Sequence, residues 1–129
     1  MTLVDTNYVI RWFLEDIPEQ AKVARRLFER APASSLHLDR LILAEITFVL
    51  RSYGYNHGNI AEIIYEISRF DAVAPLSPQE HAALSIYATT SLDYEDCFLI
   101  AEALKQENSG IATFDKKLLK TFEKLQLAE

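Results

Sequence analysis

Carboxylate side chains stand at four places in the chain from which they could reach one another. Asp5 comes just after an apolar pair at residues 3–4, and Asp115 comes just after residues 111–113. Both of these segments are predicted to be short strands, whereas Glu45 and Asp96 fall within predicted helices. Ligands of a parallel sheet bind beyond the carboxyl ends of its strands. Because carboxylates that converge there repel one another, the pattern predicts a bound cation, and Mg²⁺ or Mn²⁺ fits an all-oxygen site.

The two acids on helices stand where apolar residues would be expected. At 100° per residue, Glu45 falls within the apolar face of the helix predicted over residues 39–53. The alternative is a glutamate that is paired with a nearby Arg or Lys, or one that reaches solvent at the rim. Asp96 lies at the edge of the buried face predicted for residues 93–107. The apolar face predicted for the helix at 39–53 comprises Leu41, Ile42, Phe48 and Val49.

Four further polar residues lie close to these acids in the sequence. Asp93 begins the helix that carries Asp96, so it is either a helix cap or part of the site. Thr6, Asn7 and Thr113 flank Asp5 and Asp115, and they could hydrogen-bond metal ligands or substrate. Capping of the adjacent helices is the alternative role for these three residues.

Zinc and covalent chemistry are both disfavoured by the residue types present. The chain has a single cysteine, Cys97, and its histidines lie in unrelated segments at positions 37, 57 and 81. That arrangement matches no zinc-ligand spacing. No Ser-His-Asp or Cys-His arrangement is visible either, so no covalent intermediate is expected.

The elements that must position these residues alternate along the chain between strands and helices. Such alternation predicts crossover connections and a parallel sheet covered on both faces, an α/β protein. Asp16, Asn59, Ser77 and Asp115 are the predicted helix caps that begin four of the helices. Strands are predicted at residues 3–4, 35–38, 72–74 and 110–113, and helices at 9–14, 16–31, 39–53, 59–70, 77–89, 93–107 and after 115.

Length and composition bound the class of protein. A chain of 129 residues predicts one domain over 1–129, and at 14.7 kDa its folded surface should be about 7,000 Å². The net charge of −6 argues against a protein that grips nucleic acid with its whole surface, although it allows nucleic acid as a substrate if the acids belong to a site. One cysteine excludes a disulfide framework and suits the cytoplasm. No apolar run approaches the roughly 18 residues of a membrane span.

Four short motifs, in this order and over nearly the whole chain, resemble those of PIN-domain nucleases. They are Leu-Val-Asp-Thr-Asn at residues 3–7, Leu-Ala-Glu-Ile at 43–46, Asp-Cys-Phe-Leu-Ile-Ala-Glu-Ala at 96–103 and Ala-Thr-Phe-Asp at 112–115. At this compact length the chain looks most like the VapC-type toxins of toxin–antitoxin pairs. The chain is short after Asp115, and residues 125–127 make a poor final strand.

The resemblance implies a fold and an activity. The implied fold is a three-layer α/β/α sandwich around a central parallel sheet of four or five short strands. The implied activity is hydrolysis of RNA, with Mg²⁺ or Mn²⁺ held by Asp5, Glu45, Asp96 and Asp115, and with 5′-phosphate and 3′-hydroxyl products. A homodimer and a small antitoxin protein are the implied partners, although related domains also serve in RNA processing.

Two other functions are kept as alternatives. An aspartyl-nucleophile phosphatase also has an aspartate after its first strand, but a second aspartate is expected two positions later, where this chain has Asn7. A PIN-like binding module without activity is the other alternative, and the presence of all four acids counts against it.

Surface contacts are predicted on both sides of the acids. Arg11, Trp12 and the lysines at 116, 117 and 120 could contact RNA, or they could form ordinary solvated or partner surface. A groove between residues 9–14 and 59–70 could receive an amphipathic helix of an antitoxin, whose Arg or Lys would then enter the carboxylates. Packing of the core or of a homodimer is the alternative role for these apolar residues.

Overall fold

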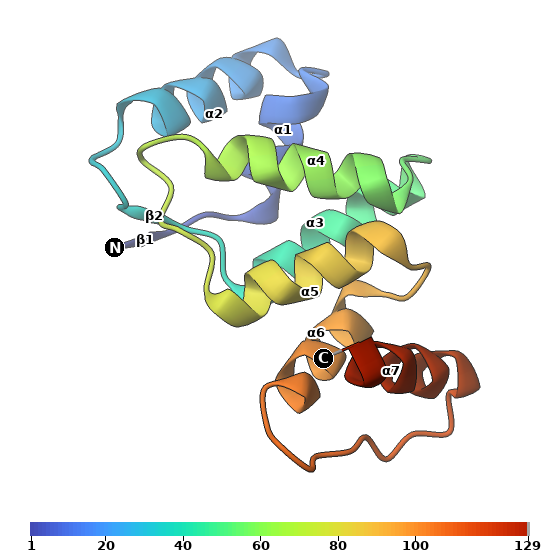
Figure 1. The fold of residues 1–129 in the computed structure, drawn as a ribbon. Coiled ribbons are helices and arrows are strands. Elements are labelled where there is room, and N and C mark those ends of the chain that lie inside the picture. Colours follow the sequence, from blue (N-terminus) through green and yellow to red (C-terminus); the bar gives the residue numbers. More distant parts are fainter. Residues whose placement is uncertain (129) are drawn as a thin grey trace.

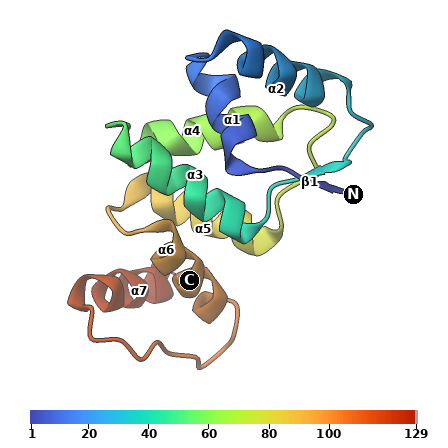
Figure 2. The same cartoon turned by 180° about the vertical axis from the view of Figure 1, so that it is seen from behind.

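The computed structural model describes residues 1–128, and in this part of the chain seven helices pack around a short parallel sheet (Figure 1). Helices lie on either side of the sheet strands, and the last two helices lie at one end of the molecule (Figures 1 and 2). The elements are β1 (Thr2–Leu3), α1 (Thr6–Leu14), α2 (Pro18–Arg30), β2 (Leu36–His37), α3 (Arg40–Ser52), α4 (His57–Ser68), α5 (Pro78–Thr89), α6 (Tyr94–Leu104) and α7 (Lys116–Ala128).

The sheet is smaller than the sequence predicts. β1 and β2 pair in parallel, with Thr2 opposite Leu36. On the other side of β2, the Leu36 N–H donates to the carbonyl of Ala72 and the Ala74 N–H donates to the carbonyl of Leu36, which places residues 72–74 beside β2 as a single bridge. Residues 110–113 form no strand in the described chain, and residues 125–127 lie in α7. The α/β class is confirmed, but the predicted sheet of four or five strands is not.

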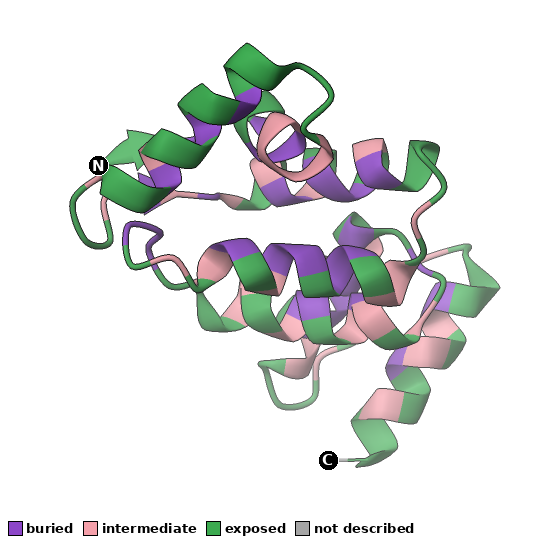
Figure 3. Cartoon of the chain, turned by 90° about the horizontal axis from the view of Figure 1, so that it is seen from above, coloured by how far each residue is buried: buried purple, intermediate pink, exposed green. Residues whose placement is uncertain are grey.

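All seven helices contribute buried residues to one hydrophobic core, and α3, α4 and α5 turn their buried faces toward one another (Figure 3). An aromatic cluster closes one side of this core, because the Trp12 ring packs edge-on against Phe28 and Phe70 with centroid separations of 6.2 and 5.9 Å. Trp12 is therefore a packing residue and is not free as an anchor for a partner. Phe13 packs against Tyr55 at 5.3 Å and leaves a hollow between α1 and α4.

The predicted orientation of α3 is wrong. Its buried residues are Leu43, Ile46, Thr47 and Leu50. Leu41 and Phe48, expected to face the core, are 69 % and 75 % exposed, and Glu45 lies between them on the exposed face. The helix has apolar residues on two faces, so periodicity alone could not decide which face packs inward. α3 therefore presents an uncovered apolar strip that contains one carboxylate.

Helix caps follow the sequence where the signal is local. Ser77 and Glu80 form the predicted capping box at the start of α5. Two predicted caps are wrong: Asp16 forms an ion pair with Arg11 instead, and α4 is capped by Asn56, whose side chain accepts from the N–H of Asn59. Asp16 lies near a competing partner, Arg11, and Asn59 lies near a second cap residue, Asn56. The residue type alone therefore does not decide which of these side chains caps a helix.

The two C-terminal helices lie at one end of the molecule, where α6 packs against α5 and α3. α7 packs on α6, and the connection at 105–115 runs along the outer edge of this end, on the far side of α6 from β1 (Figures 1 and 2). The chain exposes 8001 Å², about 1,000 Å² more than expected for its mass. Across residues 1–128, none of the helices is both long and apolar enough for a membrane span.

Candidate active site

Asp5 lies at the carboxyl end of β1, where the first strand gives way to α1. It takes the N-cap position of that helix with an extended backbone, yet its side chain makes no capping hydrogen bond. Its carboxylate is exposed and borders a hollow that Asn7, Tyr8 and Arg11 also line. A cap residue that leaves the helix N–H groups unpaired keeps its carboxylate available for another ligand.

Glu45 is joined to this strand end by a hydrogen bond across 39 residues of sequence. The buried hydroxyl of Thr6 donates to Oε2 of Glu45 at 2.6 Å. The contact connects the first residue of α1 with the middle of α3, and so it orients the Glu45 carboxylate near the end of β1. Thr6 thus contacts Glu45, and its role in support of a metal ligand stays a prediction.

A second group of acids surrounds the start of α6. Asp93 is at the N-cap position of this helix but makes no capping bond, and Glu95 and Asp96 follow in the first turn. Partial burial raises the pKa of Asp96, and the negative charges of Asp93, Asp115 and Glu95 raise it further. The charge of Asp115 thus acts on Asp96, although a long connection separates the two residues in the sequence.

Asp115 is the predicted cap of the last helix. Its Oδ1 accepts hydrogen bonds from the backbone N–H groups of Lys117 and Leu118, at 2.9 and 3.0 Å. Thr113 supports the turn, because its hydroxyl accepts from the N–H of Asp115 at 3.0 Å. The second carboxylate oxygen, Oδ2, makes none of these bonds.

The structure places the predicted acids in two groups and does not gather them into one. Asp5 and Glu45 flank the end of β1, whereas Asp96 lies in the first turn of α6 and Asp115 caps the start of α7, from where its charge acts on Asp96. Within residues 1–128, no three Asp, Glu, His or Cys side chains are close enough to hold one metal ion. The donor chemistry suits Mg²⁺ or Mn²⁺, but one chain arranged in this way does not build a complete site for either ion.

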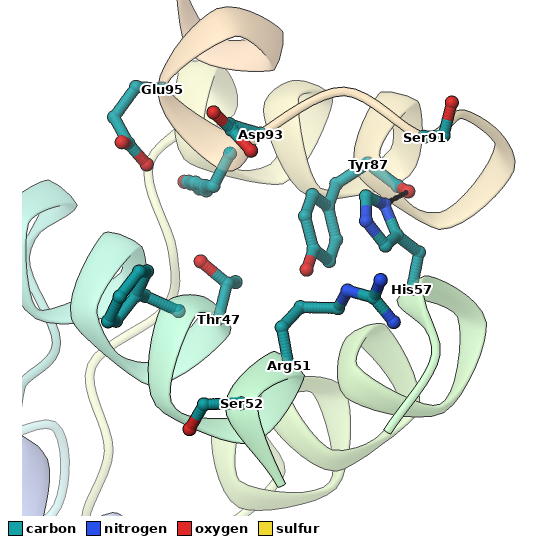
Figure 4. Close-up of a pocket in the computed structure, with 10 residues that line it drawn as sticks. Thr47, Arg51, Ser52, His57, Tyr87, Ser91, Asp93 and Glu95 are labelled. Carbon is teal, nitrogen blue, oxygen red and sulfur yellow. Dashed lines mark hydrogen bonds between the residues drawn. The ribbon is translucent and has the colours of Figure 1, made fainter. Parts of the chain in front are cut away.

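Beside the second group lies a pocket of about 530 Å³ that sequence reasoning missed (Figure 4). Thr47 and Arg51 reach it from successive turns of α3, while His57 and Tyr87 come from α4 and α5. Asp93 is on its opposite wall, so the pocket opens directly onto the acids. The sequence places Thr47 and Arg51 four residues apart, on one face of α3. The other residues of the pocket come together only through tertiary packing.

The floor of this pocket contains a stacked pair of rings and an unpaired hydroxyl. The rings of His57 and Tyr87 are stacked at 3.9 Å, and Nδ1 of His57 lies 3.0 Å from the Tyr87 carbonyl oxygen. The Tyr87 side chain is 1 % exposed and its hydroxyl has no hydrogen-bond partner in the described chain. Burial raises the pKa of Tyr87 to about 12. Arg51 donates to the carbonyl of Tyr55 at 2.9 Å, which leaves most of its N–H groups for a ligand.

Cys97 lies at the centre of α6 and takes no part in the site. It is fully buried, and burial raises the pKa of its thiol to about 12. A thiol that stays protonated at neutral pH is a poor nucleophile.

Comparison with known proteins gives one match. No curated protein and no solved structure matches the chain. The family model of the PIN domain matches residues 2–124, a span that contains both groups of acids and the pocket between α3 and α6. The chain therefore belongs to the PIN-domain family.

Proposed function

We propose that the protein is an endoribonuclease that hydrolyses RNA phosphodiester bonds with Mg²⁺ or Mn²⁺. PIN domains are typically nucleases that use divalent metals, so membership of this family supports hydrolysis of a nucleic acid. The observation that carries the proposal is the match of the PIN-domain family to residues 2–124, a span that holds Asp5, Glu45, Asp96 and Asp115. None of these four carboxylates forms an ion pair within the described residues, so each is open to a cation.

The pocket beside the acids supports RNA as the substrate. Arg51 is a cation at its wall, suited to a backbone phosphate, and Phe48 offers an exposed ring on which a base can stack. Asp93 borders the same pocket, so a strand bound there runs past the carboxylates. These contacts also explain how a chain with net charge −6 can accept a polyanion, because its positive charge is local.

The biological role that we propose is that of the toxin of a cytoplasmic toxin–antitoxin pair. The hollow between α1 and α4 offers a docking surface for the antitoxin, and it is lined by Phe13, Tyr55, Gly58, Asn59, Glu62 and Ile63. An amphipathic helix fits a hollow that is lined by both apolar and polar residues. Co-expression with the protein encoded next to it tests this role: a complex that lacks nuclease activity is expected, and an Asn59→Arg variant that binds equally well would exclude this hollow.

Cleavage of end-labelled single-stranded RNA tests the activity itself. Wild-type protein should cleave with Mg²⁺ or Mn²⁺ and stop when EDTA is added. Asp96→Asn should lose about a hundredfold or more in rate. The matched control is Glu102→Gln, an exposed carboxylate on the same helix, which should keep full activity. Cleavage that survives EDTA, or that is equal in the two variants, would exclude the proposal.

A further inference from the structure

Helix α2 carries a concentration of positive charge on a chain whose net charge is −6. Four of the 13 lysine and arginine residues lie between positions 22 and 30, and all four are exposed. They are Lys22, Arg25, Arg26 and Arg30. Arg25 pairs with Glu15, whereas the other three form no ion pair within residues 1–128. Exposed cations without partners on an acidic protein attract a polyanion locally.

Two of these arginines line a hollow of about 380 Å³ between α1 and α2. Arg26 and Arg30 stand one helical turn apart on its α2 side, where Val23 and Leu27 lie beside them. Tyr8 reaches the hollow from α1. Among the described residues, no aspartate or glutamate lines this hollow, so its charge is positive.

A second hollow adjoins the first and leads to the candidate active site. Tyr8 and Val23 line both hollows, and Asp5 and Glu19 lie in the second one. Tyr8 is also joined to the strand end that carries Asp5, because its backbone N–H donates to the Asp5 carbonyl at 3.0 Å. The surface that the two hollows share is therefore positive at one end and holds the Asp5 carboxylate at the other.

We propose that this surface, made of Tyr8, Val23, Arg26 and Arg30 and called here the α2 surface, binds single-stranded RNA next to Asp5. The choice of RNA as the ligand rests on the proposed function. Arg26 and Arg30 are about 6 Å apart along the helix axis, which is close to the spacing of successive phosphates in a nucleic-acid strand. Each arginine can therefore contact one phosphate.

An exposed ring beside the cations favours a nucleic acid over an acidic protein segment. Tyr8 is 38 % exposed and Val23 is 51 % exposed, so a base that lies on the tyrosine ring also covers apolar surface. An acidic segment would satisfy the two arginines but has no flat group for the ring. Phosphates on cations with a base on an aromatic ring are the usual contacts of single-stranded RNA.

The α2 surface is distinct from the pocket between α3 and α6. In both views of the fold, α3 lies between α2 and α6, so the two surfaces are on different sides of α3 (Figures 1 and 2). Asp5 borders the α2 surface, whereas Asp93 borders the pocket. Each group of acids therefore has its own adjacent place for a phosphate, at Arg26 and Arg30 on one side and at Arg51 on the other.

Fluorescence anisotropy with labelled single-stranded RNA in EDTA tests binding without cleavage. The double variant Arg26→Gln with Arg30→Gln should lower the slope of log affinity against log salt by about 1.4, because each phosphate contact to a single strand contributes about 0.7. The matched control is Arg25→Gln with Lys105→Gln, which removes the same charge from a paired arginine of α2 and from the end of α6. The control should keep the wild-type slope. Equal slopes in the two double variants, or no binding by the wild type, would overturn the proposal.

Two further measurements separate RNA from other polyanions. Tyr8→Ala should lower RNA affinity about fivefold or more, whereas Tyr8→Phe keeps the ring and should bind as the wild type does. Polyglutamate of equal charge should compete weakly, because it has no bases. Competition equal to that of unlabelled RNA would assign the surface to an acidic protein segment and overturn the proposal.

The binding results and the cleavage results fail separately. If the wild type binds RNA through Arg26 and Arg30 but does not cleave it with Mg²⁺ or Mn²⁺, the proposed function fails and the α2 surface stands. If the wild type cleaves RNA while both double variants bind it with the same salt slope, the α2 surface fails and the proposed function stands.

Discussion

Removal of one buried hydroxyl should stabilise this protein. The Tyr87 hydroxyl is buried without a hydrogen-bond partner, and a polar group left in this state costs about 1–3 kcal/mol. Tyr87→Phe removes the hydroxyl and keeps the ring that stacks on His57 at 3.9 Å, so no cavity forms in the ring's place. We expect the free energy of unfolding to rise by about 1 kcal/mol and the melting temperature to rise by roughly 4 °C.

The matched control is a second buried tyrosine in the same region. The Tyr94 hydroxyl donates to the carbonyl of Glu80, although at 3.5 Å this bond is long. Tyr94→Phe should therefore leave the free energy of unfolding unchanged or lower it by up to about 1 kcal/mol. The two substitutions are chemically identical, so the difference between them isolates the effect of the hydrogen-bond partner.

Urea unfolding measured by circular dichroism gives both free energies, and its pH dependence gives a further check. Because burial raises the folded pKa of Tyr87 to about 12, ionisation of this tyrosine opposes folding, and the wild type should lose stability as the pH rises from 10 toward 12. The advantage of Tyr87→Phe should therefore grow over that range. Destabilisation by more than about 1 kcal/mol at pH 7 would show that the hydroxyl has a partner, and it would refute the reasoning.

Three further outcomes are expected. Arg51→Gln should weaken RNA binding and lower the slope of log affinity against log salt by about 1, measured by fluorescence anisotropy, and an unchanged slope would exclude a phosphate contact. Asp96→Asn should raise the melting temperature of metal-free protein at pH 7, because the folded pKa of Asp96 is raised and its ionisation therefore opposes folding. This gain in melting temperature should disappear at a pH below the ordinary carboxyl pKa. A gain that persists at that pH would have another cause. Asp115→Ala should lower the free energy of unfolding, measured in urea, by about 1 kcal/mol, because α7 loses its N-cap. Asp115→Asn should lower it less, because an amide oxygen can also accept the capping hydrogen bonds. Equal losses in the two variants would show that the charge of Asp115, and not its cap, stabilises the protein.

How far the sequence predicts this structure depends on the range of the interactions involved. The capping box of Ser77 and Glu80 is formed within four residues, and the sequence predicts it correctly. The orientation of α3 depends on which of two apolar faces meets α4, and no local pattern contains that information. The strand predicted at 110–113 has suitable residues, but a strand also needs a partner, and none lies beside it in the described chain.

The candidate site was also predictable only in part. The sequence identifies the four acids by their residue types and their order along the chain. The structure adds the contact between Thr6 and Glu45, which lie 39 residues apart. Their gathering into one metal site stays a prediction. The pocket of Arg51, His57 and Tyr87 had no sequence signal, because it forms only where α3, α4 and α5 meet.

The irregular connection before α7 also sets how long the protein survives among proteases. Residues 110–113 have no regular secondary structure, and Phe114 is fully exposed, so a protease reaches this segment readily. A chymotrypsin-like enzyme is expected to cut after Phe114. That single cut would leave α7, with Asp115 at its start, held to the rest of the protein only by its packing on α6. Any partner that covers this segment therefore lengthens the lifetime of the chain as well as changing its activity.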